Sequence, residues 1–173
     1  MLNKFVRKYP LDVVSLNEAK DQLNLIDFDD DDSLIESLIE TSTHLAENYT
    51  GRLFSRCTVT VRLTPSEYCV RLPYHDIDLI TSVQVDGQDI SYEFDSFDQV
   101  LTITDTALES DDLIYVVYDA GYQPNQVSPI AATGIKMLIS ELYNYREGFA
   151  EMTVSDLPMT VTKVLGAIRI RPL

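Results

Sequence analysis

The sequence is poor in cysteine, histidine and positive charge, and it contains no tryptophan. Only two of the 173 residues are cysteine and only two are histidine. Two cysteines cannot form a disulfide framework, so we expect Cys57 and Cys69 to be reduced, with one bridge between them left open. The histidines, His44 and His75, fit no metal-ligand spacing such as HxxxH. We therefore expect neither a structural metal nor a cofactor, and a chain of this length buries roughly 70% of its unfolded surface without them.

Long apolar runs are also missing. No segment approaches the roughly 20 apolar residues of a transmembrane helix. The N-terminal stretch MLNKFVRKYPLDVV is basic but has no apolar block, so we expect no signal peptide and synthesis in the cytosol. Acidic residues number 28 against 13 lysines and arginines, which gives a formal charge of −15. This charge argues against a general nucleic-acid binder and against docking on an anionic membrane.

Recognisable catalytic motifs are absent as well. The sequence has no GxSxG nucleophile elbow, and its six glycines are scattered, so none forms a phosphate-binding loop. A pair of acids for glycoside hydrolysis stays open, because some of 28 acids must lie close together, but sugar clefts usually rely on aromatic platforms that include tryptophan. We expect His44 at a helix surface, His75 in a turn, and Cys57 and Cys69 as packed thiols in strands. No residue is therefore expected to be catalytic.

In its overall composition the chain is an ordinary globular protein. Hydrophobic residues make up 45% of the chain and charged residues 24%, which excludes a mostly disordered chain. No internal repeat or low-complexity linker is visible. We expect one domain over residues 1–173, with helical parts at 15–51 and 128–168 and a β insertion at about 56–119.

The first block, residues 15–51, is predicted to hold two helices. Ser15 and Glu18 have the spacing of a capping box, and apolar residues follow to about Ile26. Five aspartates between positions 27 and 32 then interrupt the pattern, because aspartate favours caps and turns. The second helix carries one broad apolar stripe and ends at Gly51, a residue suited to the left-handed position after a helix.

The middle block reads as five or six short strands. Apolar and polar residues alternate around positions 58–64 and 68–72. Asp86-Gly87 is a primed-turn dipeptide, so we expect a hairpin that continues through Ile90, Tyr92 and Phe94. The apolar run from Leu113 to Tyr118 is typical of a strand covered on both faces. The block predicts a small antiparallel sheet or barrel.

The last block returns to helix. Ser128-Pro129 combines a capping residue with proline at the first helical position, and the apolar pattern continues to about Arg146. Residues 147–156 are predicted to be a loop, and Leu157-Pro158 opens a final helix. The fold class is therefore α+β, a bundle of about four helices with a small antiparallel β-sheet or barrel inserted between the second and third helices.

The aspartate-rich segment admits a calcium-site hypothesis. With Asp29 at position one of an EF-hand loop, Asp31, Ser33 and Glu40 fall at positions three, five and twelve. Position six, however, is Leu34, where the loop requires glycine. A solvated cap and loop is the favoured interpretation, with negative charge placed at the positive end of the second helix.

Several short motifs occur in a characteristic order. They are LNEAKDQL at 16–23, LIESLIE at 34–40, ENYTGR at 47–52, Leu72-Pro73, YDAGY at 118–122, Pro129, YNYRE at 143–147 and Leu157-Pro158. In this order and spacing the chain resembles the head-tail connector (adaptor) family of tailed bacteriophages, in its longer form with a β insertion, over about residues 15–170. The long sheet insertion and the segment from Phe149 to Asp156 depart from other members.

The resemblance implies a non-enzymatic structural protein of the virion, made in the host cytoplasm. Family members assemble as a ring, usually of twelve copies, beneath the portal protein. The ring extends the DNA channel, through which DNA passes without sequence-specific binding, and presents a surface for the next neck or tail protein. Two alternatives remain open. One is another neck protein, such as a stopper or tail-completion protein, and the other is a small calcium-binding or hydrolase domain.

Three groups of residues are candidate assembly surfaces. The first is expected to face the lumen, since a wall that repels phosphates lets DNA slide, and comprises Asp29, Asp30, Asp31, Asp32, Glu36 and Glu40. The second is a tail for docking on the portal, or else a frayed terminus, and comprises Arg169, Ile170, Arg171, Pro172 and Leu173. The third is a subunit interface, or else ordinary core edge, and comprises Tyr122, Tyr143 and Tyr145.

Overall fold

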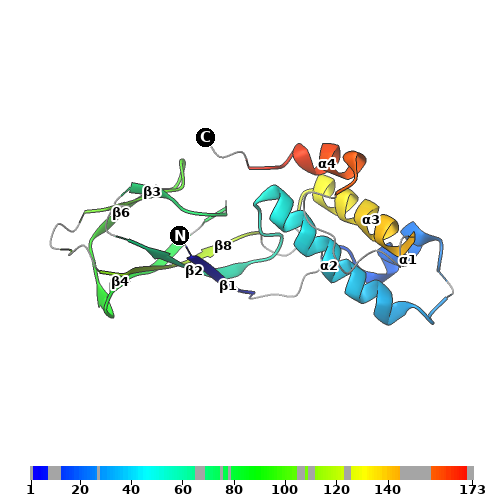
Figure 1. Ribbon diagram of the computed structural model, residues 1–173, viewed down its shortest axis with the longest axis horizontal. Coiled ribbons are helices and arrows are strands. Elements are labelled where there is room, and N and C mark those ends of the chain that lie inside the picture. The colour runs from blue at the N-terminus through cyan, green and yellow to red at the C-terminus, as the bar shows by residue number, and fades with distance from the viewer. Residues whose placement is uncertain are drawn as a thin grey trace. The chain divides into compact units, whose positions relative to one another are not determined.

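The computed structural model divides into two compact units. The strand unit comprises residues 1–9 and 55–122, and the helical unit comprises residues 10–54 and 123–173. The residues that the structure describes are 2–7, 13–26, 28–64, 69–74, 76–77, 79–104, 108, 112–122, 126–144 and 157–170. Figure 1 labels the helices and most of the strands. The expectation of a single domain stays a prediction, and each unit is described by itself below.

The helical unit contains the predicted helices. Within the described ranges they are α1 (Leu16–Leu23), α2 (Asp32–Thr50), α3 (Pro129–Asn144) and α4 (Met159–Gly166). The predicted capping box is present at the start of α1, because the amide of Glu18 donates to Ser15 Oγ at 3.3 Å and the amide of Ser15 donates to Glu18 Oε2 at 3.0 Å. At α3, the amide of Ile130 donates to Ser128 Oγ at 3.3 Å, as the Ser-Pro signal predicted.

The helix ends follow local backbone signals. α1 ends at Leu23 and does not reach Ile26, because Asn24 takes the left-handed conformation with φ 58°. Ile26 is consequently 67% exposed. α2 ends at Gly51 as predicted, with φ 70°. α3 is described only to Asn144, and the predicted end at Arg146 lies outside the described residues.

The core of the helical unit lies around α3, which contacts α1, α2 and α4. Its buried members include Ile35, Leu38, Ile39, Ile135, Leu138, Leu142, Val161 and Leu165. α4 approaches α3 at Gly134, where an added Cβ would lie 2.4 Å from Leu165 Cδ2 and 2.7 Å from its Cγ. A side chain at position 134 would therefore overlap a buried leucine.

The strand unit holds two antiparallel sheets. The five-stranded sheet has the order β1-β2-β8-β4-β5 and the three-stranded sheet the order β3-β7-β6. The strands are β1 (Leu2–Arg7), β2 (Cys57–Leu63), β3 (Cys69–Arg71), β4 (Leu79–Val85), β5 (Gln88–Asp89), β6 (Tyr92–Asp95), β7 (Val100–Ile103) and β8 (Ile114–Ala120). The predicted α+β class is confirmed, with strands separating α2 from α3.

β1 was not predicted from the sequence. It pairs with β2 along its whole length, from Leu2 opposite Arg62 to Arg7 opposite Cys57. Its sequence, LNKFVR, lacks a regular alternation of apolar and polar residues. Its strand conformation therefore comes from backbone hydrogen bonds to a segment some fifty residues away, which a local pattern does not report.

The predicted hairpin is correct at its turn and wrong in its extent. Asp86 and Gly87 both have positive φ, at 49° and 81°, as a primed turn requires. The second strand, β5, is however only two residues long. Tyr92 and Phe94 belong to β6, which pairs with β7 in the other sheet. The chain thus changes sheets directly after the turn.

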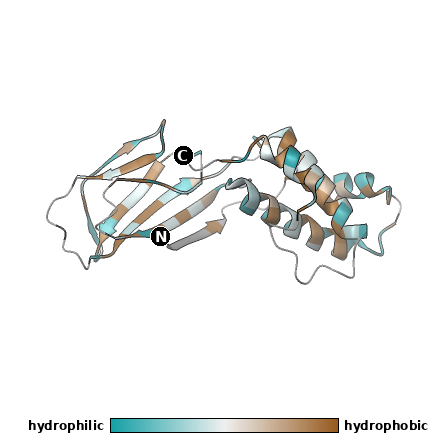
Figure 2. Cartoon of the chain, turned by 45° about the horizontal axis from the view of Figure 1, so that its top comes forward, coloured by the Kyte–Doolittle hydropathy of each residue, from teal (hydrophilic) through white to brown (hydrophobic). Residues whose placement is uncertain are grey.

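The apolar run in β8 is covered on one face only, and the prediction of cover on both faces was wrong. Ile114, Val116 and Tyr118 are buried, whereas Tyr115 between them is 41% exposed. The three-stranded sheet forms a second layer on one side of the five-stranded sheet (Figure 1). Alternating hydrophobic and polar bands along the strands are visible in Figure 2. A tyrosine in an apolar run can thus mark a half-exposed face.

The side of the five-stranded sheet turned away from its buried residues is here called the outer sheet face. It carries Thr60 and Arg62 of β2, Tyr115 and Val117 of β8, and Leu79 of β4. Arg62 and Tyr115 are directly opposite each other in the β2–β8 register. Leu79 is 64% exposed and Arg62 is exposed. The opposite side is buried, and there Tyr118 donates its hydroxyl to the carbonyl of Pro73 at 2.7 Å while burial raises the pKa of its phenol.

An ion pair between α1 and α3 makes the stability of the helical unit depend on pH. Lys136 Nζ lies 2.9 Å from Glu18 Oε1. The hydrogen bond from the Ser15 amide, followed by that from Lys136, lowers the pKa of Glu18 to about 2. Because this pKa is depressed in the folded chain, its stabilising contribution is present above the unfolded pKa and is lost as the pH falls toward 2.

We expect Glu18→Gln to reduce the acid sensitivity of the folded chain. The free energy of unfolding of the parent should fall between about pH 5 and 2 more steeply than that of the variant, because the variant has no carboxyl to protonate at this position. Urea titrations at several pH values would measure the difference. Glu36→Gln, at an exposed position of α2, is the matched control. Parallel pH profiles for parent and Glu18→Gln would contradict the prediction.

Candidate functional site

The C-terminal segment Ala167–Ile170, here called the C-terminal strap, lies against the end of α2. The amide of Ile170 donates to the carbonyl of Thr50 at 2.8 Å. The Nε of Arg52 donates to the carbonyl of Ile168 at 2.6 Å. Two hydrogen bonds thus join residues that are more than a hundred positions apart in the sequence, and one of them comes from a charged donor, which strengthens it.

Tyr49 and Gly51 complete this attachment. The guanidinium carbon of Arg169 lies 4.7 Å from the centroid of the Tyr49 ring, within cation–π range. The Tyr49 hydroxyl donates to the carbonyl of Thr162 in α4 at 3.1 Å. Gly51 provides the left-handed turn, and an added Cβ there would lie 3.7 Å from Ile170 Cβ. The consecutive residues 49–52 therefore all contribute to one seat for the strap.

This seat changes the interpretation of the predicted docking tail. Arg169 and Ile170 are held by the chain's own α2, so the alternative of a frayed terminus does not apply to them. Residues 171–173 lie outside the described residues. Sequence reasoning noted the NYTGR motif but not its role, because nothing in the motif indicates which distant segment it contacts.

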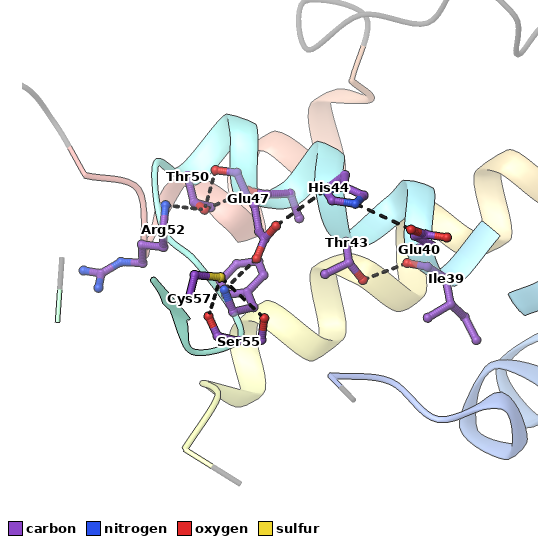
Figure 3. A network of polar contacts seen from close by, with 11 residues as sticks. Ile39, Glu40, Thr43, His44, Glu47, Thr50, Arg52, Ser55 and Cys57 are labelled. Carbon is purple, nitrogen blue, oxygen red and sulfur yellow. Dashed lines mark hydrogen bonds and ion pairs between the residues drawn. The ribbon is translucent and has the colours of Figure 1, made fainter. Parts of the chain in front are cut away.

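A buried carboxylate fixes the chain where it leaves α2. Glu47 is only 4% exposed, and its Oε1 accepts a hydrogen bond from the amide of Phe54 at 2.8 Å. His44 Nδ1 lies 3.7 Å from Glu47 Oε2, and His44 Nε2 lies 3.8 Å from Glu40 Oε1. Figure 3 shows this row of side chains along α2. His44 is on the helix surface, as predicted, and Glu47 holds the chain just after the seat residues 49–52.

The six predicted lumen acids separate into two kinds. Asp31 and Asp32 are half-buried and hold helices together, whereas Asp29, Asp30, Glu36 and Glu40 are exposed. Tyr143 donates its hydroxyl to Asp31 Oδ2 at 2.5 Å. Lys20 Nζ lies 2.9 Å from Asp32 Oδ1 and 2.5 Å from Asp29 Oδ1. Asp29, then Asp32, raises the pKa of Lys20. Lys20 itself is buried, which the sequence did not predict.

The structure gives the tyrosines different roles. Tyr143 is half-buried, and its hydrogen bond to Asp31 ties the end of α3 to the start of α2. Tyr122 is half-buried beyond the end of β8. Tyr145 lies outside the described residues. Their assignment to a subunit interface stays a prediction.

The cysteines differ from each other. Both are free, with Cys57 buried and Cys69 exposed, so the expectation of a packed thiol was wrong for Cys69. Cys69 begins β3, a three-residue strand at the edge of its sheet, where the side chain is not covered. His75 lies outside the described residues.

The described residues contain no group of three or more histidine, cysteine or acidic side chains placed to hold a metal ion. Leu34 and Glu40, which an EF-hand would place in its loop, lie inside α2. Among the helices that the structure describes, none is long and apolar enough to cross a membrane.

Comparisons with known proteins add a family and a fold. Residues 13–169 match the family described as phage gp6-like head-tail connector protein. No curated protein matches the chain. Among solved structures, a chain of the "Virion of native gene transfer agent (GTA) particle" is 16% identical with a TM-score of 0.74, and one of the "Neck of empty GTA particle computed with C6 symmetry" is 17% identical with a TM-score of 0.76. A third, from the "Neck of native GTA particle computed with C12 symmetry", is 15% identical with a TM-score of 0.75. Each match covers 100% of this chain and 98% of the other, and at these identities it establishes a shared fold.

Proposed function

This chain belongs to the phage gp6-like head-tail connector protein family, and we propose that it acts as a ring-forming structural component in the neck of a virus particle. The observation that carries the proposal is the family match, which extends from before α1 to the C-terminal strap. The shared fold with chains from particle necks solved with sixfold and twelvefold symmetry supports a ring. The role is architectural, and no catalytic step is assigned to it.

The strap gives this proposal a structural basis in the helical unit. We assign the residues after Ile170 to docking on a portal protein, because the seat on α2 fixes the point from which they continue. A short segment that starts from a fixed point loses less conformational entropy on binding than one that starts from a mobile end. A downstream neck or tail protein is the partner assigned to the other end of the ring.

The channel wall is assigned to the exposed acids of the helical unit. Asp29, Asp30, Glu36 and Glu40 are exposed, although Asp29 also pairs with Lys20. Negative side chains along a channel repel the phosphates of passing DNA and oppose its adhesion. Asp31 and Asp32, which hold helices together, are removed from the set that faces DNA directly.

We expect a ring of this chain between head and tail in particles of the virus that encodes it. Electron cryomicroscopy of the neck would measure the copy number and the position of each subunit, with particles lacking this gene as the control. The same map locates the four exposed acids, and their placement on the outer surface would refute the lumen assignment. Absence of the chain from mature particles would refute the whole proposal.

A further inference from the structure

The turn between β6 and β7 presents an exposed aromatic side chain. Phe97 is 91% exposed, more than any other large hydrophobic residue that the structure describes. The turn is internally braced, because Asp95 Oδ1 accepts from the amides of Phe97 at 2.8 Å and Asp98 at 3.3 Å. Gln99 is buried and its Oε1 accepts from the amide of Ile77 at 3.1 Å. Phe97 therefore extends from an ordered turn into solvent, where its ring is free to be buried by a partner, and such burial is favourable.

The charged residues within the turn, Asp95 and Asp98, are both acidic, while the exposed Arg71 lies opposite Val100 on the neighbouring strand β3. Positions 72–135 contain no lysine or arginine, and Asp95 and Asp98 flank the exposed ring. A surface that covers Phe97 must therefore be apolar at its centre and positive beside it. Such a surface would bury the Phe97 ring and pair a positive side chain with the carboxylates of Asp95 and Asp98.

The outer sheet face has this combination. Tyr115 is 41% exposed, and the exposed Arg62 is its direct cross-strand partner. The β6–β7 turn belongs to the three-stranded layer, whereas the outer sheet face is the far side of the five-stranded layer (Figure 1). The chain thus carries two different surfaces on two sheets of the same compact unit, and a head-to-tail contact between identical subunits requires two such different, complementary surfaces.

We propose that the Phe97 turn of one subunit docks on the outer sheet face of the next copy of this chain. The Phe97 ring covers Tyr115, and Asp98 together with Asp95 faces Arg62. A second copy is favoured over another protein because both halves of the complementary pair are present on this chain. The inference rests on the proposed ring and names one contact within it. Aromatic pairing and opposite charge give the contact its register.

Cross-linking between two single-cysteine variants tests the contact. The background is the full chain with Cys69→Ser, in which Cys57 stays buried. Phe97→Cys protein is mixed with differently tagged Tyr115→Cys protein under mild oxidation, and the mixed disulfide is measured by mass. Thr160→Cys, at an exposed position of α4, replaces Tyr115→Cys in the matched control. We expect the mixed dimer to form with Tyr115→Cys well above the control, whereas equal yields would overturn the proposal.

Substitution tests the same contact without oxidation. Phe97→Ser should weaken self-association of the full chain about tenfold or more, because an aromatic anchor is removed. Asp98→Arg should weaken it, and Arg62→Asp in the same chain should restore part of the loss. Unchanged self-association of a folded Phe97→Ser variant would overturn the proposal. Particles that keep their neck ring but show residues 97 and 115 of neighbouring subunits apart would overturn this contact alone, whereas particles without a ring would remove the proposed function as well.

Discussion

Gly134→Ala is expected to destabilise the helical unit by about 1–2 kcal/mol, although alanine in place of glycine normally stabilises a helix interior by about 1 kcal/mol. The reason is steric. The new Cβ would lie 2.4 Å from Leu165 Cδ2 and 2.7 Å from Leu165 Cγ. Leu165 is fully buried and cannot turn into solvent, so α4 must shift away from α3. Urea unfolding of the full chain, followed by far-ultraviolet circular dichroism, would measure the loss.

Leu165→Ala provides the control for this prediction. On its own it should cost about 2–5 kcal/mol, because a buried leucine is replaced by a cavity. In that background the overlap with position 134 is gone, so Gly134→Ala should now be neutral or stabilising. The sign of the glycine effect would thus reverse between the two backgrounds. Additive effects of the two substitutions would contradict the steric explanation.

Arg52→Ala is expected to release the C-terminal strap while the rest of the fold persists. The substitution removes the charged donor to the Ile168 carbonyl, an interaction worth about 1.5–3 kcal/mol. Hydrogen exchange at the Ile170 amide, which donates to Thr50, should accelerate about 10- to 100-fold as local opening becomes easier.

Arg71→Ala is the matched control, since Arg71 is an exposed arginine of β3 in the strand unit. It should leave exchange at Ile170 unchanged. Exchange at buried amides of α3 should stay slow in both variants, which separates release of the strap from unfolding of the helical unit. If Ile170 remained as protected in Arg52→Ala as in the parent, the seat would not depend on this arginine. A loss of portal docking that follows strap release would in addition support the role proposed for the tail.

The features that could be predicted from sequence are those set by neighbouring residues. The Ser15 capping box, the left-handed Gly51 and the Ser128-Pro129 start all appear where local signals placed them. Each depends on hydrogen bonds or backbone angles within a few positions of the chain. The α+β class could be predicted as well, because it follows from the order of helical and strand patterns along the chain, and each pattern is local.

The features that could not be predicted depend on distant pairing. β1 is a strand because β2 lies beside it, and the chain changes sheets after Gly87 because β7 pairs with β6. The role of Arg52 depends on Ile168, 116 positions away. Burial of Lys20 likewise follows from carboxylates that the α1–α2 turn brings to it. No local pattern reports such contacts.

The chain builds the helical unit from two separated stretches, residues 10–54 and 123–173, and this order has a consequence for biosynthesis. During translation α1 and α2 leave the ribosome long before α3 and α4. Their apolar sides therefore lack their packing partners while the intervening strands are synthesised. The final helix, α4, packs Leu165 against Gly134, and the amide of Ile170 then donates a hydrogen bond to the carbonyl of Thr50. A polypeptide that stops short of α4 lacks the buried Val161 and Leu165 and therefore cannot complete the core of this unit.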